Sequence, residues 1–237
     1  MPIQNYLVYT FLIAGMLLSI RFKKLTITAA ITGAIMGLLI YQGAGLTGIG
    51  MLTLFFILGS GATGWQIHSK QQIGAAEKDK GRRTAGQVIA NGGVAALIGA
   101  IIWRMPEAAA SHRLMMAGSL AAATADTLAS ELGTVYGKRF YNIITFKKDQ
   151  RGLDGVVSLE GTLIGIAGAA LIAVVYSIGF GWNINFLWIV IGGAIGNLAD
   201  SVLGATLERK HLIGNNVVNF LNTLIGALVC LLLLKMV

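Results

Sequence analysis

The sequence predicts a polytopic, all-α membrane protein of about eight transmembrane helices, folded as a single integral membrane domain over residues 1–237. Composition gives the first indication. Only 12% of the residues are charged and the mean hydropathy is +0.74, whereas about 25% of residues are charged in soluble domains. Because each membrane-spanning helix needs about 20 mainly apolar residues, eight spans leave loops too short to form a soluble domain.

Breaks in the apolar pattern define the eight expected spans in chain order. The separators are RFKK, the Gly-rich QGAGLT, the basic segment 67–85, RMPEAAASHR, the basic segment 134–155, GFGWNI and LERKHLIGN. The spans between them are 5–20, 25–41, 48–66, 86–103, 114–133, 156–178, 185–206 and 216–234. The first has no basic segment or cleavage site typical of a signal peptide, so it is expected to be retained. Cys230 is the only cysteine, which excludes a disulfide scaffold.

The basic residues predict the orientation in a cell membrane. Fifteen of the 18 Lys and Arg residues fall in segments 21–24, 67–85, 134–155 and 207–215, and only Arg104, Arg113 and Lys235 fall opposite. By the positive-inside rule, the first group faces the cytoplasm and both termini lie outside. The net charge of +8 then reflects orientation and contact with anionic headgroups, so no nucleic-acid partner is expected.

Five acidic residues fall within or at the end of predicted spans, all toward the predicted cytoplasmic face: Asp126, Glu131, Glu160, Asp200 and Glu208. Ionisable groups in the membrane are energetically costly and indicate function, although any single one could be paired or reach the interface. Asp126 and Glu131 are five residues apart, about 140° around a helix, so they need not contact the same ligand.

Polar residues on other spans follow helical spacing toward the same end. These residues are Arg83, Gln87 and Asn91; Ser158 and Thr162; Asn197, Asp200 and Glu208; and Asn215, Asn219 and Asn222. Five helices are therefore expected to turn polar faces toward one site. For each asparagine alone, a hydrogen bond between helices explains the residue equally well.

Basic residues in the adjoining loops supply the complementary charge, among them Arg82, Arg83, Lys138 and Arg139. Carboxylates beside guanidinium groups are typical of a site for Mg²⁺ and phosphate. There is no Walker A motif, since GTVYGKR has the wrong spacing and no Ser or Thr after its lysine. The three histidines are scattered through separate loops, so no zinc site is expected.

Two short motifs recur and suggest an internal repeat. ADTLA at Asp126 resembles ADSVL at Asp200, and GTLIG at 161–165 resembles NTLIG at 222–226. Such a duplication would place Asp126 and Asp200 symmetrically around a shared site.

Five motifs in order resemble an integral-membrane family that includes the plant phytyl-phosphate kinase: RTAGQVIANGG from Arg83, ADTLASELG around Asp126, GVVSLEGT from Gly155, DSVLGAT from Asp200 and NNVVNF from Asn215. Part of the pattern also resembles the wider group of CTP-dependent polyprenol kinases. The resemblance implies phosphoryl transfer from a nucleoside triphosphate, with CTP favoured, to an isoprenoid monophosphate such as phytyl, geranylgeranyl or farnesyl phosphate.

Together, the residues and the resemblance define the expected site. Asp126, Glu131 and Asp200 are expected to hold Mg²⁺, with Glu160 as a further ligand or lysine partner. Phosphates would contact Arg82, Arg83, Lys138 and Arg139, and the nucleotide or substrate would contact Asn91, Ser158, Thr162, Asn215, Asn219 and Asn222. The expected partners are the nucleotide, the isoprenoid monophosphate and the lipid bilayer, and a homodimer is left open.

Two other classes remain as alternatives. A secondary transporter would also have repeated helices and intramembrane acids, but would hold its acids near the membrane midplane. A cytidylyltransferase that forms a CDP-lipid would share CTP, metal and lipid acceptor, but would release pyrophosphate.

Overall fold

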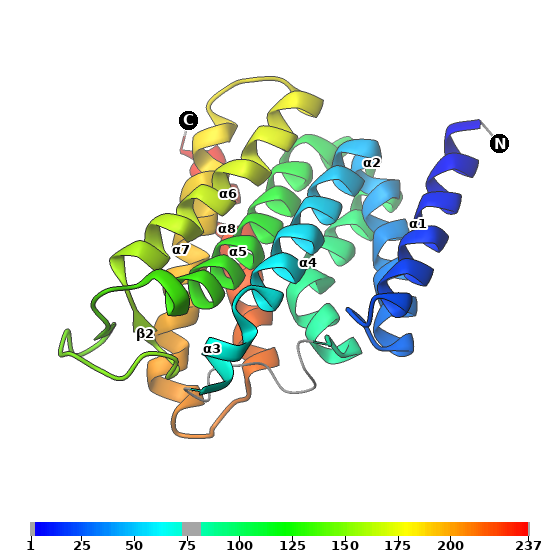
Figure 1. The fold of residues 1–237 in the computed structure, drawn as a ribbon. Coiled ribbons are helices and arrows are strands. Elements are labelled where there is room, and N and C mark those ends of the chain that lie inside the picture. Colours follow the sequence, from blue (N-terminus) through cyan, green and yellow to red (C-terminus); the bar gives the residue numbers. More distant parts are fainter. Residues whose placement is uncertain (1–2, 73–81, 237) are drawn as a thin grey trace.

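The computed structural model describes residues 3–72 and 82–236, which form a helical bundle (Figure 1). The helices are α1 (Ile3–Arg21), α2 (Ile27–Gly64), α3 (Ile67–Gln72), α4 (Ala85–Arg104), α5 (Ala109–Tyr136), α6 (Leu159–Phe180), α7 (Asn185–Leu203) and α8 (Asn215–Lys235). A short 3₁₀ turn, Pro106–Ala108, precedes α5, and a π-helical turn, Gly204–Glu208, follows α7. The predicted polytopic all-α class is confirmed.

Helix α2 consists of two antiparallel legs that match the predicted spans 25–41 and 48–66. Gly45 has a φ of +59° and interrupts the helical backbone. The Gly48 backbone packs on Ile40, and a Cβ on Gly37 would lie 3.5 Å from Leu52, whereas a straight helix would separate residues 37 and 52 by about 22 Å. The chain therefore reverses at Gly45, as Figure 1 shows.

Six helices of the described chain are long and apolar enough to cross a membrane: α1, α2, α4, α6, α7 with its π turn, and α8. Helix α5, predicted as a span over 114–133, is 28 residues long but is not among them by composition. Half of its residues are buried because it packs against α2, α4, α6, α7 and α8. A helix enclosed by other helices needs little lipid-facing apolar surface, which explains the small and polar residues of α5.

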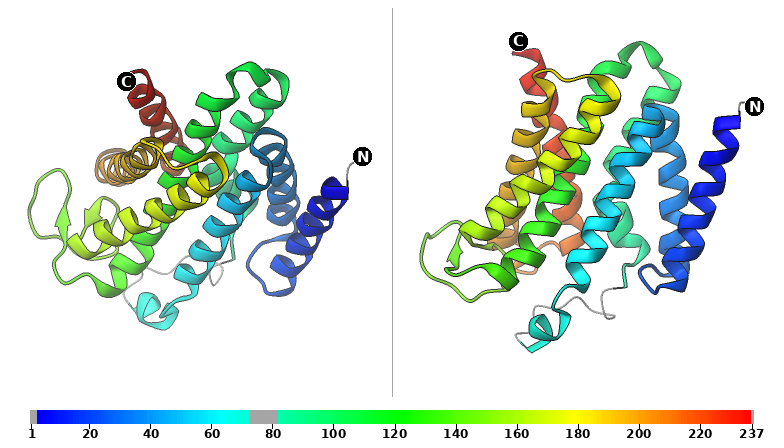
Figure 2. Two further views of the ribbon diagram at one scale, coloured as in Figure 1. Left: turned by 90° about the horizontal axis from the view of Figure 1, so that it is seen from above. Right: turned by 45° about the horizontal axis from the view of Figure 1, so that its top comes forward.

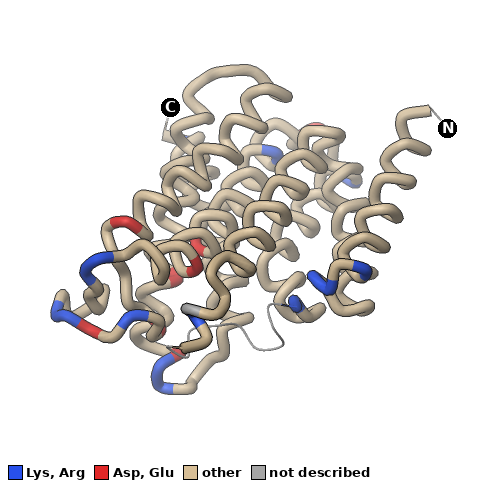
Figure 3. Tube along the Cα trace, viewed as in Figure 1, with Lys and Arg blue, Asp and Glu red and all other residues tan. Residues whose placement is uncertain are grey.

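Most of the charged residues gather at one end of the bundle (Figure 3), and both termini lie at the opposite end (Figures 1 and 2). This segregation agrees with the predicted division of the loops, although which end faces the cytoplasm stays a prediction. Lys78 and Lys80, which contributed to that division, lie outside the described residues.

The segment between α5 and α6 is folded back onto the bundle at this charged end. It contains a small antiparallel sheet of β1 (Tyr141–Asn142) and β2 (Val156–Val157), although the sequence had indicated that 156–157 begin a helix. Gly155 has a φ of +70° and lies directly against Ala205 of the π turn. An ion pair of 2.8 Å also joins Asp149 of this loop to Arg209, the residue that directly follows the π turn.

Candidate active site

A polar cavity of about 840 Å³ opens at the charged end of the bundle. Its walls come from α4, α5, α6, α7, α8, the π turn and residues 152–157. Five helices thus direct polar faces toward one site, as their residue spacing predicted.

Three helices begin at this cavity. The Thr84 side chain caps α4 and the Ser158 side chain caps α6, whereas Gly214 precedes α8 with no side-chain cap. The starts of α4 and α8 are adjacent, because a Cβ on Gly86 would lie 2.8 Å from the Asn216 amide nitrogen. Helix N-termini carry partial positive charge and unpaired N–H groups, so together they favour an anion such as phosphate.

Two arginines stand beside these helix starts and line the cavity. The Arg83 backbone N–H donates to the Lys24 carbonyl, and the Arg83 carbonyl accepts from the Thr26 N–H, which fixes the segment against the start of α2. The Arg82 Nε donates to the Leu25 carbonyl at 3.1 Å. The Arg83 guanidinium carbon lies 5.5 Å from the Phe55 ring centroid, and the residue is buried. A buried guanidinium stacked on an aromatic ring is a preorganised donor for phosphate.

Carboxyl groups enter the cavity from helices that run in the opposite direction. The side chains of Asp126 of α5 and Asp200 of α7 are close neighbours, and the Asn222 amide donates to Asp200 Oδ1 at 3.4 Å. Small residues permit this approach: a Cβ on Gly196 would lie 2.6 Å from Ala122 Cβ and 2.9 Å from Asn222 Oδ1. The predicted meeting of Asp126 and Asp200 is therefore present, whereas the internal repeat stays a prediction.

The docked loop adds a carboxylate, that of Asp154, which was not among the predicted site residues. Asp154 packs on the π turn, with its Cβ 3.6 Å from the position that a Cβ on Gly204 would take. Asp154 interacts electrostatically with both Asp200 and Glu208, and all three residues line the cavity. A π turn moves the following residues around the helix axis and often occurs at functional sites.

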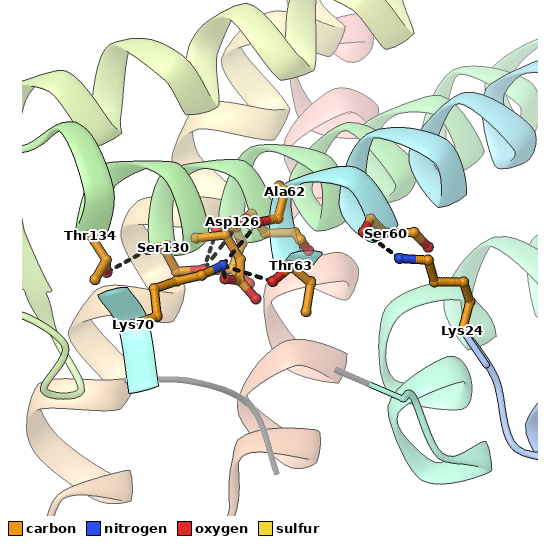
Figure 4. Close-up of polar contacts among 10 residues, drawn as sticks. Lys24, Ser60, Ala62, Thr63, Lys70, Asp126, Ser130 and Thr134 are labelled. Carbon is orange, nitrogen blue, oxygen red and sulfur yellow. Dashed lines mark hydrogen bonds and ion pairs between the residues drawn. The ribbon is translucent and has the colours of Figure 1, made fainter. Parts of the chain in front are cut away.

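Glu131 also lines the cavity, but its carboxylate is ion-paired with Lys70. The ammonium group of Lys70 additionally donates to the carbonyls of Ala62 and Thr63, each at 2.9 Å (Figure 4). Lys70 is 1% exposed and comes from the short helix α3. Helical spacing did not reveal this residue, because its ion-pair partner Glu131 is 61 residues away in the sequence.

A magnesium ion fits the donors that meet here. Mg²⁺ usually takes one or two carboxylates and completes its shell with water and substrate phosphates, and the adjoining Asp126 and Asp200 supply such a pair. Within residues 3–72 and 82–236, no group of three or more His, Cys, Asp or Glu side chains is arranged to hold one ion. The predicted ligands Asp126, Glu131 and Asp200 therefore do not form such a group, although Asp126 and Glu131 interact electrostatically.

Most of the predicted site residues line the cavity: Arg82, Arg83, Asn91, Asp126, Glu131, Ser158, Thr162, Asp200, Asn215 and Asn219. Asn222 lies behind the wall and supports Asp200. Glu160, Lys138 and Arg139 are not among the lining residues. Glu160 instead accepts a hydrogen bond from the Lys138 backbone N–H at 3.3 Å; its predicted roles as a further metal ligand or as the partner of a lysine side chain stay predictions.

The fold is that of a polytopic α-helical membrane protein with a polar cavity at one end of its helical bundle. The chain matches the family described as integral membrane protein DUF92 over residues 10–227, and it belongs to that family. The motifs that carried the predicted family resemblance all lie within the matched range, and the resemblance is confirmed.

Relatives come from a plant, an archaeon and a cyanobacterium. Protein VTE6, chloroplastic, of Arabidopsis thaliana is 34% identical over 208 residues, covering 84% of this chain and 62% of that protein. An uncharacterized membrane protein of Methanocaldococcus jannaschii is 33% identical over 86% of this chain and 83% of that protein. An uncharacterized membrane protein of Synechocystis is 34% identical over 83% of this chain and 78% of that protein. The chain thus spans less than two thirds of the Arabidopsis protein. No solved structure matches.

Proposed function

We propose that this protein is a kinase that transfers a phosphoryl group from a nucleoside triphosphate, with CTP favoured, to an isoprenoid monophosphate. The proposal rests on one observation: positively charged groups line one side of the cavity, and carboxyl groups line another side. Helix N-termini with Arg82 and Arg83 offer positive charge, and Asp126 with Asp200 offers negative charge beside them. Phosphoryl transfer is mainly positioning and charge neutralisation, which this arrangement suits.

The location of the cavity supports an amphipathic acceptor. An isoprenoid monophosphate keeps its tail in hydrocarbon and its phosphate near the interface, where a nucleotide from solution must also reach it. The lining residues place the cavity at one end of the membrane bundle, the end where Figure 3 shows most of the charged residues. This location suits both requirements. The family resemblance to the plant phytyl-phosphate kinase supports the isoprenoid class and the diphosphate product.

The proposed reaction follows from the charges. Arg82, Arg83 and the starts of α4 and α8 hold the phosphates, and Asp126 and Asp200 would hold Mg²⁺. The metal, when bound, neutralises charge on the transferred phosphoryl group. An oxygen of the acceptor phosphate forms a bond to the γ-phosphorus as the bond to the β-phosphate oxygen breaks, which releases the nucleoside diphosphate. The acceptor phosphate is already ionised near pH 7, so no strong general base is required.

The test is to incubate purified protein with Mg²⁺, a panel of isoprenoid monophosphates and CTP labelled on either the γ or the α phosphate. The proposal predicts that γ-labelled CTP gives labelled isoprenoid diphosphate. With α-labelled CTP the lipid should stay unlabelled. Entry of α-label into the lipid, with release of pyrophosphate, would identify a cytidylyltransferase instead. If no isoprenoid monophosphate accepts γ-label from any nucleoside triphosphate, the kinase proposal is wrong.

A further inference from the structure

One wall of the cavity, on the outer part of α5, offers hydrogen-bond acceptors. Ser130, Glu131 and Thr134 all line the cavity. The Ser130 hydroxyl already donates to the Asp126 carbonyl at 2.8 Å, and the Thr134 hydroxyl donates to the Ser130 carbonyl at 2.6 Å (Figure 4). Since each hydroxyl has one proton, both oxygens can only accept from a ligand. The neighbouring Glu131 carboxylate is a further acceptor.

Lys70 fixes Glu131 in this wall. All three ammonium protons of Lys70 have acceptors, two on carbonyls at the end of α2 and one on Glu131 Oε2. A lysine saturated in this way, and buried, has no proton for a ligand. The second carboxylate oxygen of Glu131 has no hydrogen-bond partner among the described residues, and the side chain is 12% exposed. The pair therefore presents one oriented acceptor toward the cavity.

Ligand chemistry decides which group can use this acceptor wall. Ionised phosphates are acceptors only, and the donors that suit them are at Arg82, Arg83 and the starts of α4 and α8. An isoprenoid monophosphate has no other polar group. A nucleoside triphosphate also carries ribose hydroxyls, and carboxylates commonly bind these in nucleotide sites.

We propose that Glu131, positioned by Lys70, binds a ribose hydroxyl of the nucleoside triphosphate. The assignment rests on the proposed function and defines the nucleoside end of the cavity. It also separates Glu131 from the metal, in agreement with the lack of a three-carboxylate group in the described chain. Lys70 acts through Glu131 as a positioning residue.

The test compares a ribonucleoside triphosphate with its 2′-deoxy and 3′-deoxy analogues. The wild-type enzyme is expected to lose about ten- to a hundredfold in kcat/KM with at least one analogue, as for a lost hydrogen bond to a charged group. A single change at Lys70 or Glu131 leaves a buried charge unpaired and threatens folding, whereas replacement of both partners is better tolerated. The test variant is therefore Lys70→Met/Glu131→Leu.

With the ribonucleotide, kcat/KM of this double variant is expected to fall by the same factor of about ten to a hundred. The double variant should then have the same kcat/KM for ribonucleotides and deoxynucleotides. Its KM for the isoprenoid monophosphate and its Mg²⁺ requirement should stay within about twofold of wild type. Lys24→Met is the matched control. Lys24 lies at the same end of the bundle and donates to a backbone carbonyl, that of Ser60 at 3.5 Å, but it does not line the cavity.

Three results would overturn the assignment. If the double variant needs more Mg²⁺ but still discriminates between ribose and deoxyribose, Glu131 is a metal ligand. If the double variant instead loses discrimination among the bases, Glu131 contacts the base. An active wild-type enzyme that accepts both deoxynucleotides fully would refute the ribose contact while leaving the kinase function standing. If the wild type transfers no phosphoryl group, the ribose contact is tested by binding alone. The increase in melting temperature is then measured with ribonucleotides and with deoxynucleotides, in the wild type and in the double variant.

Discussion

Replacing Gly155 by alanine tests whether the docked loop is needed for activity. Gly155 has a φ of +70°, where an L-residue costs about 1–2 kcal/mol. The added Cβ would also lie 2.5 Å from Ala205 Cα and closer still to Ala205 Cβ, and such overpacking costs about 1–3 kcal/mol. The sum, about 2–5 kcal/mol, shifts the docking equilibrium of the loop roughly thirtyfold or more at about 1.4 kcal/mol per factor of ten.

Undocking would withdraw Asp154 from Asp200 of α7 and Glu208 of the π turn, and it would open the cavity to water. We therefore expect Gly155→Ala to lower kcat/KM by at least about tenfold and to speed tryptic cleavage after Arg151. Gly181→Ala is the control, because Gly181 has a φ of +97° with nothing within 4 Å of an added Cβ, and it lies at the opposite end of the bundle. Activity within twofold of wild type with unchanged cleavage would refute the reasoning.

Asp126→Asn and Asp200→Asn should each remove nearly all turnover while the protein still folds, because the amide keeps the shape of the side chain and loses its charge; near-normal turnover in both would leave them only a structural role. The N–H of Gln150 and the guanidinium of Arg209 hold the pKa of Asp149 below its usual value of 3.8. This carboxylate therefore stabilises the fold above the unfolded-state pKa and loses that effect as pH falls through its folded pKa. The melting-temperature difference between wild type and Asp149→Asn should thus be present at pH 7 and vanish in strong acid, and a constant difference would contradict the ion pair. Finally, a cysteine introduced at Gln150 should react with a membrane-impermeant reagent only from the cytoplasm and one at Ala109 only from outside; reaction of both from one side would refute the predicted topology.

The helices were predictable because hydropathy and charge act locally. QGAGLT separated two spans, and the reversal at Gly45 follows from a glycine at a positive φ. The polar faces of α4, α7 and α8 were also predictable, since residues three or four apart share a helix face. Regular spacing therefore identified most of the cavity lining before any contact was known.

The remaining site residues depend on contacts between distant segments. Lys70 and Glu131 are 61 residues apart, and neither local sequence indicates the other. Asp154 reaches the cavity only because Gly155 allows its loop to pack on the π turn. Glu160 lies two residues after the inward-facing Ser158, and successive residues turn by about 100° around a helix, so it points elsewhere.

The depth of the acids bears on the choice between enzyme and transporter. Asp126 lies ten residues before the end of α5, about 15 Å along the axis, which is deeper than the sequence had suggested. On the far side of the acids, however, α5, α7 and α8 are tightly closed: a Cβ on Gly118 or Gly192 would lie 2.6 or 2.9 Å from the Gly226 carbonyl. The cavity has no lining residue from the first 17 positions of α5. Alternating access would require these backbone contacts to separate, whereas phosphoryl transfer at a site open to one side requires no such movement.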